Sequence, residues 1–146
     1  MKSDFDYQSL PISFAHCLNE HCLRADKCLR RQVALRIPKE RGALTIVNPG
    51  HVMLDGKDCT FFIDEHPLQY ARGMTHLLDR VPLSDAKIID KQIRAYFGRN
   101  NYYRSMSKVR LIKPQEQEYI RQLFRRKGIT DEPVFDEYVE YYDLSR

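Results

Sequence analysis

The spacing of apolar and polar residues predicts three short strands in the first half of the chain. The runs VALRI (33–37), ALTIV (43–47) and CTFFI (59–63) are rich in β-branched or aromatic residues, which favour strands. The segments PKERG and NPGHVMLDGKD separate the runs, and their Asn-Pro-Gly and Asp-Gly sequences are typical of turns. We therefore expect a small antiparallel sheet in this half.

Helical spacing dominates the second half. A helix is predicted over 67–81, with Pro67 in its first turn. Another helix is predicted to follow Ser84, a favourable N-cap residue, and to end at Gly98. One apolar stripe of this second helix consists of Ile89, Ile93, Tyr96 and Phe97.

Two further helices are expected near the C-terminus, after an extended segment. Residues 101–112, NYYRSMSKVRLI, favour a β-hairpin or wing. Pro114 is expected to open the next helix and Gly128 to close it, with Ile129 packing back against Phe124. The last helix would carry an apolar face, which we interpret as core packing, made of Phe135, Tyr138, Val139 and Tyr142.

These elements predict an α+β protein in two parts. Residues 1–66 would form a Cys-containing subdomain with the small antiparallel sheet, and residues 67–146 a helical half with a possible β-wing. We expect the two parts to pack as one unit. A chain of 146 residues suffices for one domain, or for a domain with a small satellite.

Composition excludes some broad classes of protein. Hydrophobic residues make up 42% and charged residues 30% of the chain, as in globular rather than disordered proteins. No apolar run approaches the roughly 20 residues that span a bilayer, and the N-terminus has no signal-peptide pattern. We therefore expect a cytoplasmic protein without a membrane partner, in which cysteines remain thiols or metal ligands.

The most distinctive segment is FAHCLNEHCLRADKCLRR, residues 14–31. With the fourth cysteine, the spacing is C-x4-C-x5-C-x30-C, and the candidate zinc ligands are Cys17, Cys22, Cys28 and Cys59. Four thiolates suffice for a closed tetrahedral zinc site, which would staple the N-terminal segment to the sheet. The spacing differs from the C-x2-C knuckle, and His16 or His21 would allow a Cys3His variant.

A competing hypothesis needs no metal. If residues 13–30 form one helix, the cysteines Cys17 and Cys28 join an apolar stripe and behave as small buried hydrophobes. They would then lie about 16 Å apart along the axis and could not share one ion. The two hypotheses exclude each other, because a shared metal requires the helix to be broken. An iron–sulfur cluster, a disulfide and a catalytic thiol are weaker alternatives.

Four blocks carry a resemblance to a known family: FDYQSLPISFAHCLNEHCLRADKCLRR, YFGRNNYYRS, KPQEQEYIRQLF and PVFDEYVEYYDL. Together they resemble a family of short bacterial proteins classed only as a domain of unknown function, over nearly the whole chain. The resemblance implies that relatives carry cysteines at these four positions, often with a proline after the second, where this chain has Leu23. It favours zinc and implies no activity.

Charge is unevenly distributed along a chain whose net charge is +4. Residues 94–113 contain six Lys or Arg and no acid, whereas residues 131–143 contain six acids and no base. Cations contact phosphates and aromatic rings stack on unpaired bases, so the predicted nucleic-acid contacts are Arg99, Tyr102, Tyr103, Arg104 and Lys108. The alternative is that the tyrosines pack in the core and the acidic tail pairs with the arginines.

No arrangement of residues indicates catalysis. The sequence lacks an HExxH pattern, a phosphate-binding glycine loop and a paired acid and base. We therefore expect a non-enzymatic, zinc-stapled binding or regulatory module, with nucleic acid or another protein as its partner. The alternatives are an interaction protein with buried thiols and no metal, and an iron–sulfur or redox protein.

Overall fold

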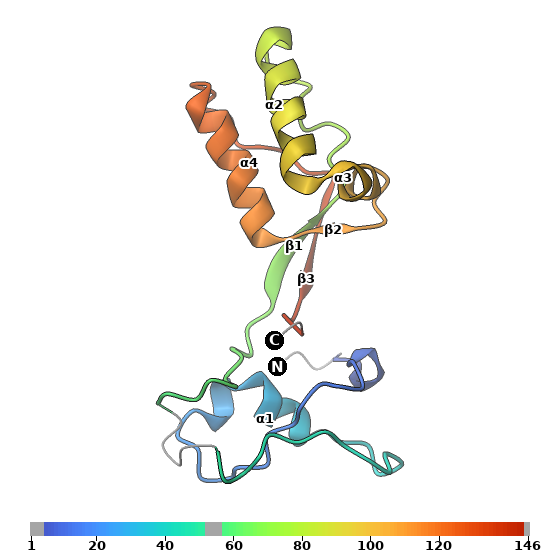
Figure 1. Cartoon of the computed structure of the whole chain (residues 1–146), viewed down its shortest axis with the longest axis vertical. Coiled ribbons are helices and arrows are strands. Elements are labelled where there is room, and N and C mark those ends of the chain that lie inside the picture. Colours follow the sequence, from blue (N-terminus) through green and yellow to red (C-terminus); the bar gives the residue numbers. More distant parts are fainter. Residues whose placement is uncertain (1–4, 52–56, 145–146) are drawn as a thin grey trace. The chain divides into compact units, whose positions relative to one another are not determined.

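The computed structural model describes residues 5–51 and 57–144 and divides the chain into two compact units (Figure 1). Unit 1 comprises Met1–Pro67 with Tyr142–Arg146, and unit 2 comprises Leu68–Tyr141. The protein is α+β, with its helices concentrated in the second half, as the sequence predicted. The predicted Asp-Gly turn at 55–56 lies outside the described residues. Within the described part of the chain, no helix has both the length and the apolar character needed to cross a lipid bilayer.

Unit 2 contains a three-stranded antiparallel sheet. Its central strand β1 (Leu68–Arg72) pairs with β2 (Leu111–Ile112) on one side and β3 (Glu137–Tyr141) on the other. The predictions of a helix over residues 67–81 and of a helix at the C-terminus are therefore wrong, because these segments contain strands β1 and β3. Gly73, at φ 78°, ends β1 in a conformation that a continuing helix could not adopt.

Unit 2 also contains three helices, of which α4 contacts β1 and α2 contacts both α3 and α4 (Figure 1). Helix α2 (Leu83–Phe97) begins one residue before the predicted cap and ends at Gly98, as predicted. Helix α4 (Pro114–Arg126) begins at the predicted proline. The backbone N–H of Ile129 donates to the Phe124 carbonyl at 3.0 Å, which confirms the predicted glycine-terminated helix end at Gly128.

The predicted wing is instead helix α3 (Arg99–Met106). Tyr102 and Ser105 are buried three residues apart on its inner face, which is helical spacing. Gly98, at φ 75°, lets the chain turn between α2 and α3. Of the predicted extended segment, Leu111–Ile112 forms a strand.

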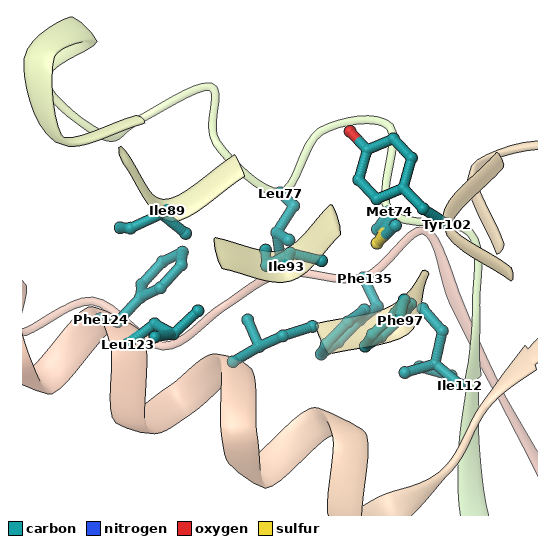
Figure 2. Packing of buried hydrophobic residues seen from close by; sticks show 12 residues of the cluster. Met74, Leu77, Ile89, Ile93, Phe97, Tyr102, Ile112, Leu123, Phe124 and Phe135 are labelled. Carbon is teal, nitrogen blue, oxygen red and sulfur yellow. The ribbon is translucent and has the colours of Figure 1, made fainter. Parts of the chain in front are cut away.

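Unit 2 has a substantial apolar core. Figure 2 shows side chains of α2 and α4 meeting residues from the strands and loops. The buried cluster consists of Ala71, Met74, Leu77, Ile89, Ile93, Phe97, Tyr102, Ile112, Ile120, Leu123, Phe124 and Phe135. Burying each large apolar side chain contributes about 1.5–3 kcal/mol, so this core is a major source of hydrophobic stabilisation in unit 2.

Unit 1 contains little regular structure. Its helical elements are η1 (Tyr7–Ser9), η2 (Ala25–Lys27) and α1 (Leu29–Ala34). Its described residues form two isolated β-bridges, His16 with Ile46 and Cys28 with Asp64, and no strand of the predicted sheet. The predicted strand VALRI (33–37) is absent because its first residues belong to α1. Val33 lies on the buried face of that helix, one turn after Leu29.

The buried core of unit 1 is also small. Phe14, Leu29, Val33 and Ile63 form its buried cluster. Partly buried side chains surround this cluster: Phe5, Tyr7, Leu10, Tyr142 and Leu144. So small a core gives limited hydrophobic stabilisation, and small domains of this kind commonly depend on a metal or another cross-link.

Candidate functional site

The segment that carries three of the cysteines is not one helix. At His16 the backbone pairs with a distant segment: its N–H donates to Thr45 at 2.8 Å, and its carbonyl accepts from Val47 at 2.9 Å. Turns and η2 follow, and α1 begins only after Cys28. The single-helix hypothesis is therefore wrong, and the break that a shared metal requires lies between Cys17 and Cys28.

Backbone hydrogen bonds join the segments that contain the cysteines. The N–H of Cys17 donates to the Arg30 carbonyl at 3.2 Å. The N–H of Leu29 donates to the Ile63 carbonyl at 2.7 Å, beside the bridge of Cys28 with Asp64. Cys59 lies four residues before Ile63, in a turn. The chain thus brings three segments, distant in sequence, to one place in unit 1.

All four thiols are free, with Cys17 and Cys28 buried and Cys22 and Cys59 partly exposed. Burial raises the pKa of the Cys17 thiol, a hydrogen bond with the backbone of Asn19 opposes this, and the charges of the other three cysteines raise it further. The other three thiols therefore lie close enough to Cys17 to affect its ionisation. In residues 5–51 and 57–144, no three His, Cys, Asp or Glu side chains are arranged so that they could hold a metal ion.

The two histidines beside the cysteines differ in their surroundings. His16 is buried, and its ring nitrogens contact the Tyr7 hydroxyl at 2.6 Å and the Thr45 carbonyl at 3.0 Å. Both nitrogens are therefore engaged, which leaves His16 no free donor atom for a metal. His21 is exposed, and its backbone N–H donates to Asn19 Oδ1.

In unit 2, the predicted nucleic-acid contacts are only partly brought together. Tyr102 is 6% exposed, and its hydroxyl donates to Asp90 Oδ1 at 2.5 Å. Burial, followed by the hydrogen bond and charge of Asp90, raises the pKa of Tyr102 to about 12. Its ring therefore offers little surface for stacking on a base, whereas the neighbouring Tyr103 is 50% exposed.

Arg94, which was not among the predicted contacts, connects the polar groups of this region. Its Nε donates to Asp90 Oδ2 at 2.8 Å, and a terminal nitrogen donates to the Tyr103 hydroxyl at 3.2 Å. The guanidinium also lies 4.6 Å from the centre of the Tyr102 ring. A surface pocket of about 440 Å³ is lined by Arg94, Ala95, Arg99, Tyr102 and Tyr103. The four-residue spacing from Asp90 to Arg94 could have identified the ion pair.

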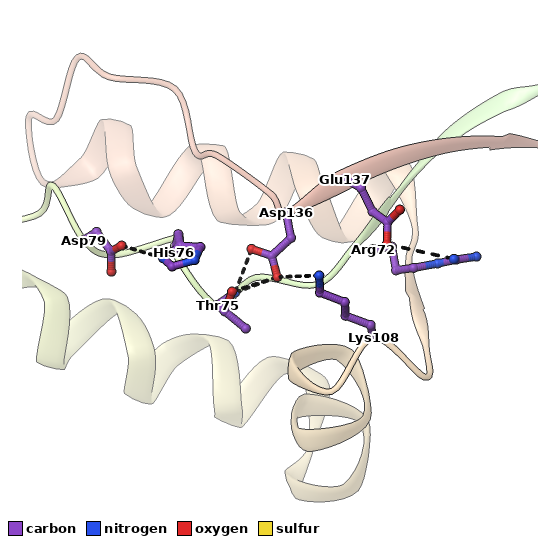
Figure 3. A network of polar contacts seen from close by, with 7 residues as sticks. All are labelled: Arg72, Thr75, His76, Asp79, Lys108, Asp136 and Glu137. Carbon is purple, nitrogen blue, oxygen red and sulfur yellow. Dashed lines mark hydrogen bonds and ion pairs between the residues drawn. The ribbon is translucent and has the colours of Figure 1, made fainter.

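The other two predicted contacts, Arg104 and Lys108, do not line this pocket. Arg104 is exposed on α3. Figure 3 shows Lys108 beside Asp136, with 4.0 Å between Nζ and Oδ2. Although burial opposes it, hydrogen bonds from Thr75 and the charge of Lys108 help to lower the pKa of Asp136. Lys108 therefore belongs to a polar network distinct from the arginine–tyrosine pocket.

Comparison with known proteins identifies the family. The chain belongs to a family of unknown function, DUF6078, whose model matches residues 1–144. This agrees with the family resemblance given by the four sequence blocks. No curated protein and no solved structure matches the chain.

Proposed function

We propose that the protein is a non-enzymatic, cytoplasmic binding or regulatory module whose first unit is stabilised by a structural zinc ion. The proposed ligands are Cys17, Cys22, Cys28 and Cys59. Four thiolates close the tetrahedral coordination of zinc and leave no position for a substrate, so the role of the ion would be structural. A reducing cytoplasm would keep these thiols available as ligands.

The observation that carries this proposal is that backbone hydrogen bonds join the segments that bear Cys17, Cys28 and Cys59, and that all four thiols are free. The side chains would have to move from their positions in this structure to reach Zn–S distances of about 2.3 Å, because no three donor side chains of the described residues are so arranged. The donor set also fits this metal, because zinc binds thiolates well and an all-cysteine site needs no further ligand.

The thin core of unit 1 supports the same proposal. This unit has four residues in its buried apolar cluster and one short α-helix among its described residues. Because a structural zinc contributes its binding free energy directly to folding, it would supply the stability that this core does not. We therefore expect unit 1 to depend on the metal more strongly than unit 2.

Substitution of single ligands tests the proposal. Zinc in purified, untagged protein should fall from about one equivalent to well below that in Cys17→Ser and Cys59→Ser. His21→Ala is the matched control, because this side chain adjoins Cys22 and is not a proposed ligand. Full zinc in the cysteine variants would contradict the ligand assignment, and loss of zinc in His21→Ala would favour the Cys3His variant. A brown protein would instead indicate an iron–sulfur cluster.

A second candidate function is contact with nucleic acid, supported by the pocket on α2 and α3. Arg94 and Arg99 offer cations to phosphate, and the half-exposed Tyr103 offers a ring for stacking. Lys87 and Lys91 are exposed on the same face of α2 as Arg94, at helical spacing. This surface suits single-stranded nucleic acid, whose unpaired bases are free to stack.

Binding of labelled oligonucleotides, measured by fluorescence anisotropy at low and high salt, tests this candidate. We expect salt-sensitive binding of single strands, weakened by Arg99→Ala and Tyr103→Ala. Arg126→Ala, an exposed arginine of α4 outside the pocket, is the control and should bind normally. If neither single strands nor duplexes bind at low salt, nucleic acid is excluded and a protein partner is favoured.

A further inference from the structure

We infer that Arg30 is a positioning residue of the proposed zinc centre, holding the ligand-bearing segments together and offsetting the negative charge of the thiolates. The inference rests on the zinc site proposed above. It assigns a role to a residue that is not itself a ligand. It also predicts that the affinity for metal depends on a side chain outside the four cysteines.

The hydrogen bonds of Arg30 connect the three segments. Its Nε donates to the Phe61 carbonyl at 2.9 Å, and a terminal nitrogen donates to the Ala15 carbonyl at 2.9 Å. Phe61 lies two residues after Cys59, Ala15 two residues before Cys17, and Arg30 itself two residues after Cys28. One side chain therefore fixes the backbone next to three of the four proposed ligands.

The environment of Arg30 favours this role. The residue is only 6% exposed, and its guanidinium lies 5.0 Å from the centre of the Phe14 ring in the core of unit 1. A buried cation is costly unless hydrogen bonds and opposite charges compensate it. The two carbonyls provide hydrogen bonds, and nearby thiolates would provide the opposite charge.

Burial lowers the pKa of Arg30, and the negative charges of Cys28, Cys59 and Cys17 oppose this effect, in decreasing order of strength. These cysteines are therefore among the charged neighbours of the guanidinium. A zinc ion with four thiolates carries a net charge of about −2, which is unfavourable in a partly buried position unless a cation lies close. The guanidinium would reduce this charge, and its planar fork suits two carbonyl acceptors at once, which a lysine cannot reproduce.

Metal affinities of full-length variants test the inference, measured by competition with a chromophoric zinc chelator. We expect Arg30→Gln to weaken zinc binding about 10- to 100-fold, the range typical of residues that support metal ligands. Arg30→Lys should weaken zinc binding less than Arg30→Gln does, because lysine keeps the positive charge but lacks the planar guanidinium that contacts two carbonyls. The control is Arg36→Gln, an exposed arginine just after α1, and it should bind as the unmodified protein does.

Cobalt substitution provides a readout that a general loss of stability would not change. In Arg30→Gln we expect the thiolate-to-cobalt charge-transfer band to shift, with a smaller shift in Arg30→Lys, because a nearby cation alters the energy of the sulfur electrons. Unchanged affinity and an unchanged spectrum in Arg30→Gln would overturn the inference while leaving the zinc site intact. If that variant does not fold, unchanged affinity in Arg30→Lys would overturn it. Absence of zinc from the unmodified protein would instead refute the proposed function.

Discussion

Ionisation of Tyr102 at high pH should destabilise unit 2 by an amount that the structure sets. The ring is almost completely buried, and its hydroxyl donates to Asp90 at 2.5 Å. A phenolate in this position would lose its hydration and face a carboxylate, so the folded protein favours the neutral phenol and raises the pKa of Tyr102 to about 12.

The sign and size of the effect follow from linkage. The model value is 10.0 and the folded value about 12, so the full contribution is present below pH 10 and is lost as the pH rises to 12. Each pKa unit corresponds to about 1.4 kcal/mol. The free energy of unfolding should therefore fall by about 1.4 kcal/mol at pH 11, and by up to about 2.7 kcal/mol above pH 12.

Urea denaturation followed by far-UV circular dichroism measures this loss. The variant Tyr102→Phe removes the titrating group and keeps the ring, so the comparison cancels the ionisation of lysines, thiols and other tyrosines. We expect the stability difference between the two proteins to be constant up to about pH 9 and to change by about 1.4 kcal/mol at pH 11. Parallel pH profiles for the two proteins would refute the reasoning.

Two further predictions concern the packing of unit 2, measured by the same denaturation. A Cβ at Gly73 would lie 2.9 Å from Asp136 Cγ, whereas one at Gly98 meets nothing within 4 Å, although both have positive φ. Gly98→Ala should therefore lower the free energy of unfolding by about 1–2 kcal/mol, because of backbone strain alone. Gly73→Ala should lower it clearly more, because the new Cβ also clashes with Asp136. Equal losses of stability in the two variants would contradict this. Ile120→Ala should lower the free energy of unfolding by about 2–5 kcal/mol, because Ile120 is fully buried. Ile88 is 44% exposed, so Ile88→Ala should lower it by less than about 1 kcal/mol. Similar losses in the two variants would contradict this assignment of the core.

The sequence predicted those parts of the fold that depend on local interactions. Gly98, Pro114 and Gly128 act on adjacent backbone, so they located the helix ends correctly. Strands β1 and β3 were missed because they pair with each other across more than 60 residues. In the run EYVEY, polar and apolar residues do not alternate strictly. Its glutamates are three residues apart, which is the spacing of one face of a helix.

The candidate site was predicted as a set of residues but not as a conformation. Spacing could not decide between a ligand loop and one helix, because the deciding contact is the pairing of His16 with Thr45 and Val47, which local sequence does not reveal. Arg30 and Arg94 were missed for a related reason. Their roles depend on carbonyls or rings contributed by segments distant in sequence or by a neighbouring helix.

The most direct test of the central claim combines metal analysis with thiol counting on the full, untagged chain. We predict about one zinc per chain, thiols that react slowly until a chelator removes the metal, and loss of ordered structure in unit 1 when the metal leaves. The helices of unit 2 should remain, since their core does not involve the cysteines. A folded protein without metal, whose structure and thiol reactivity do not change on adding a chelator, would contradict the claim.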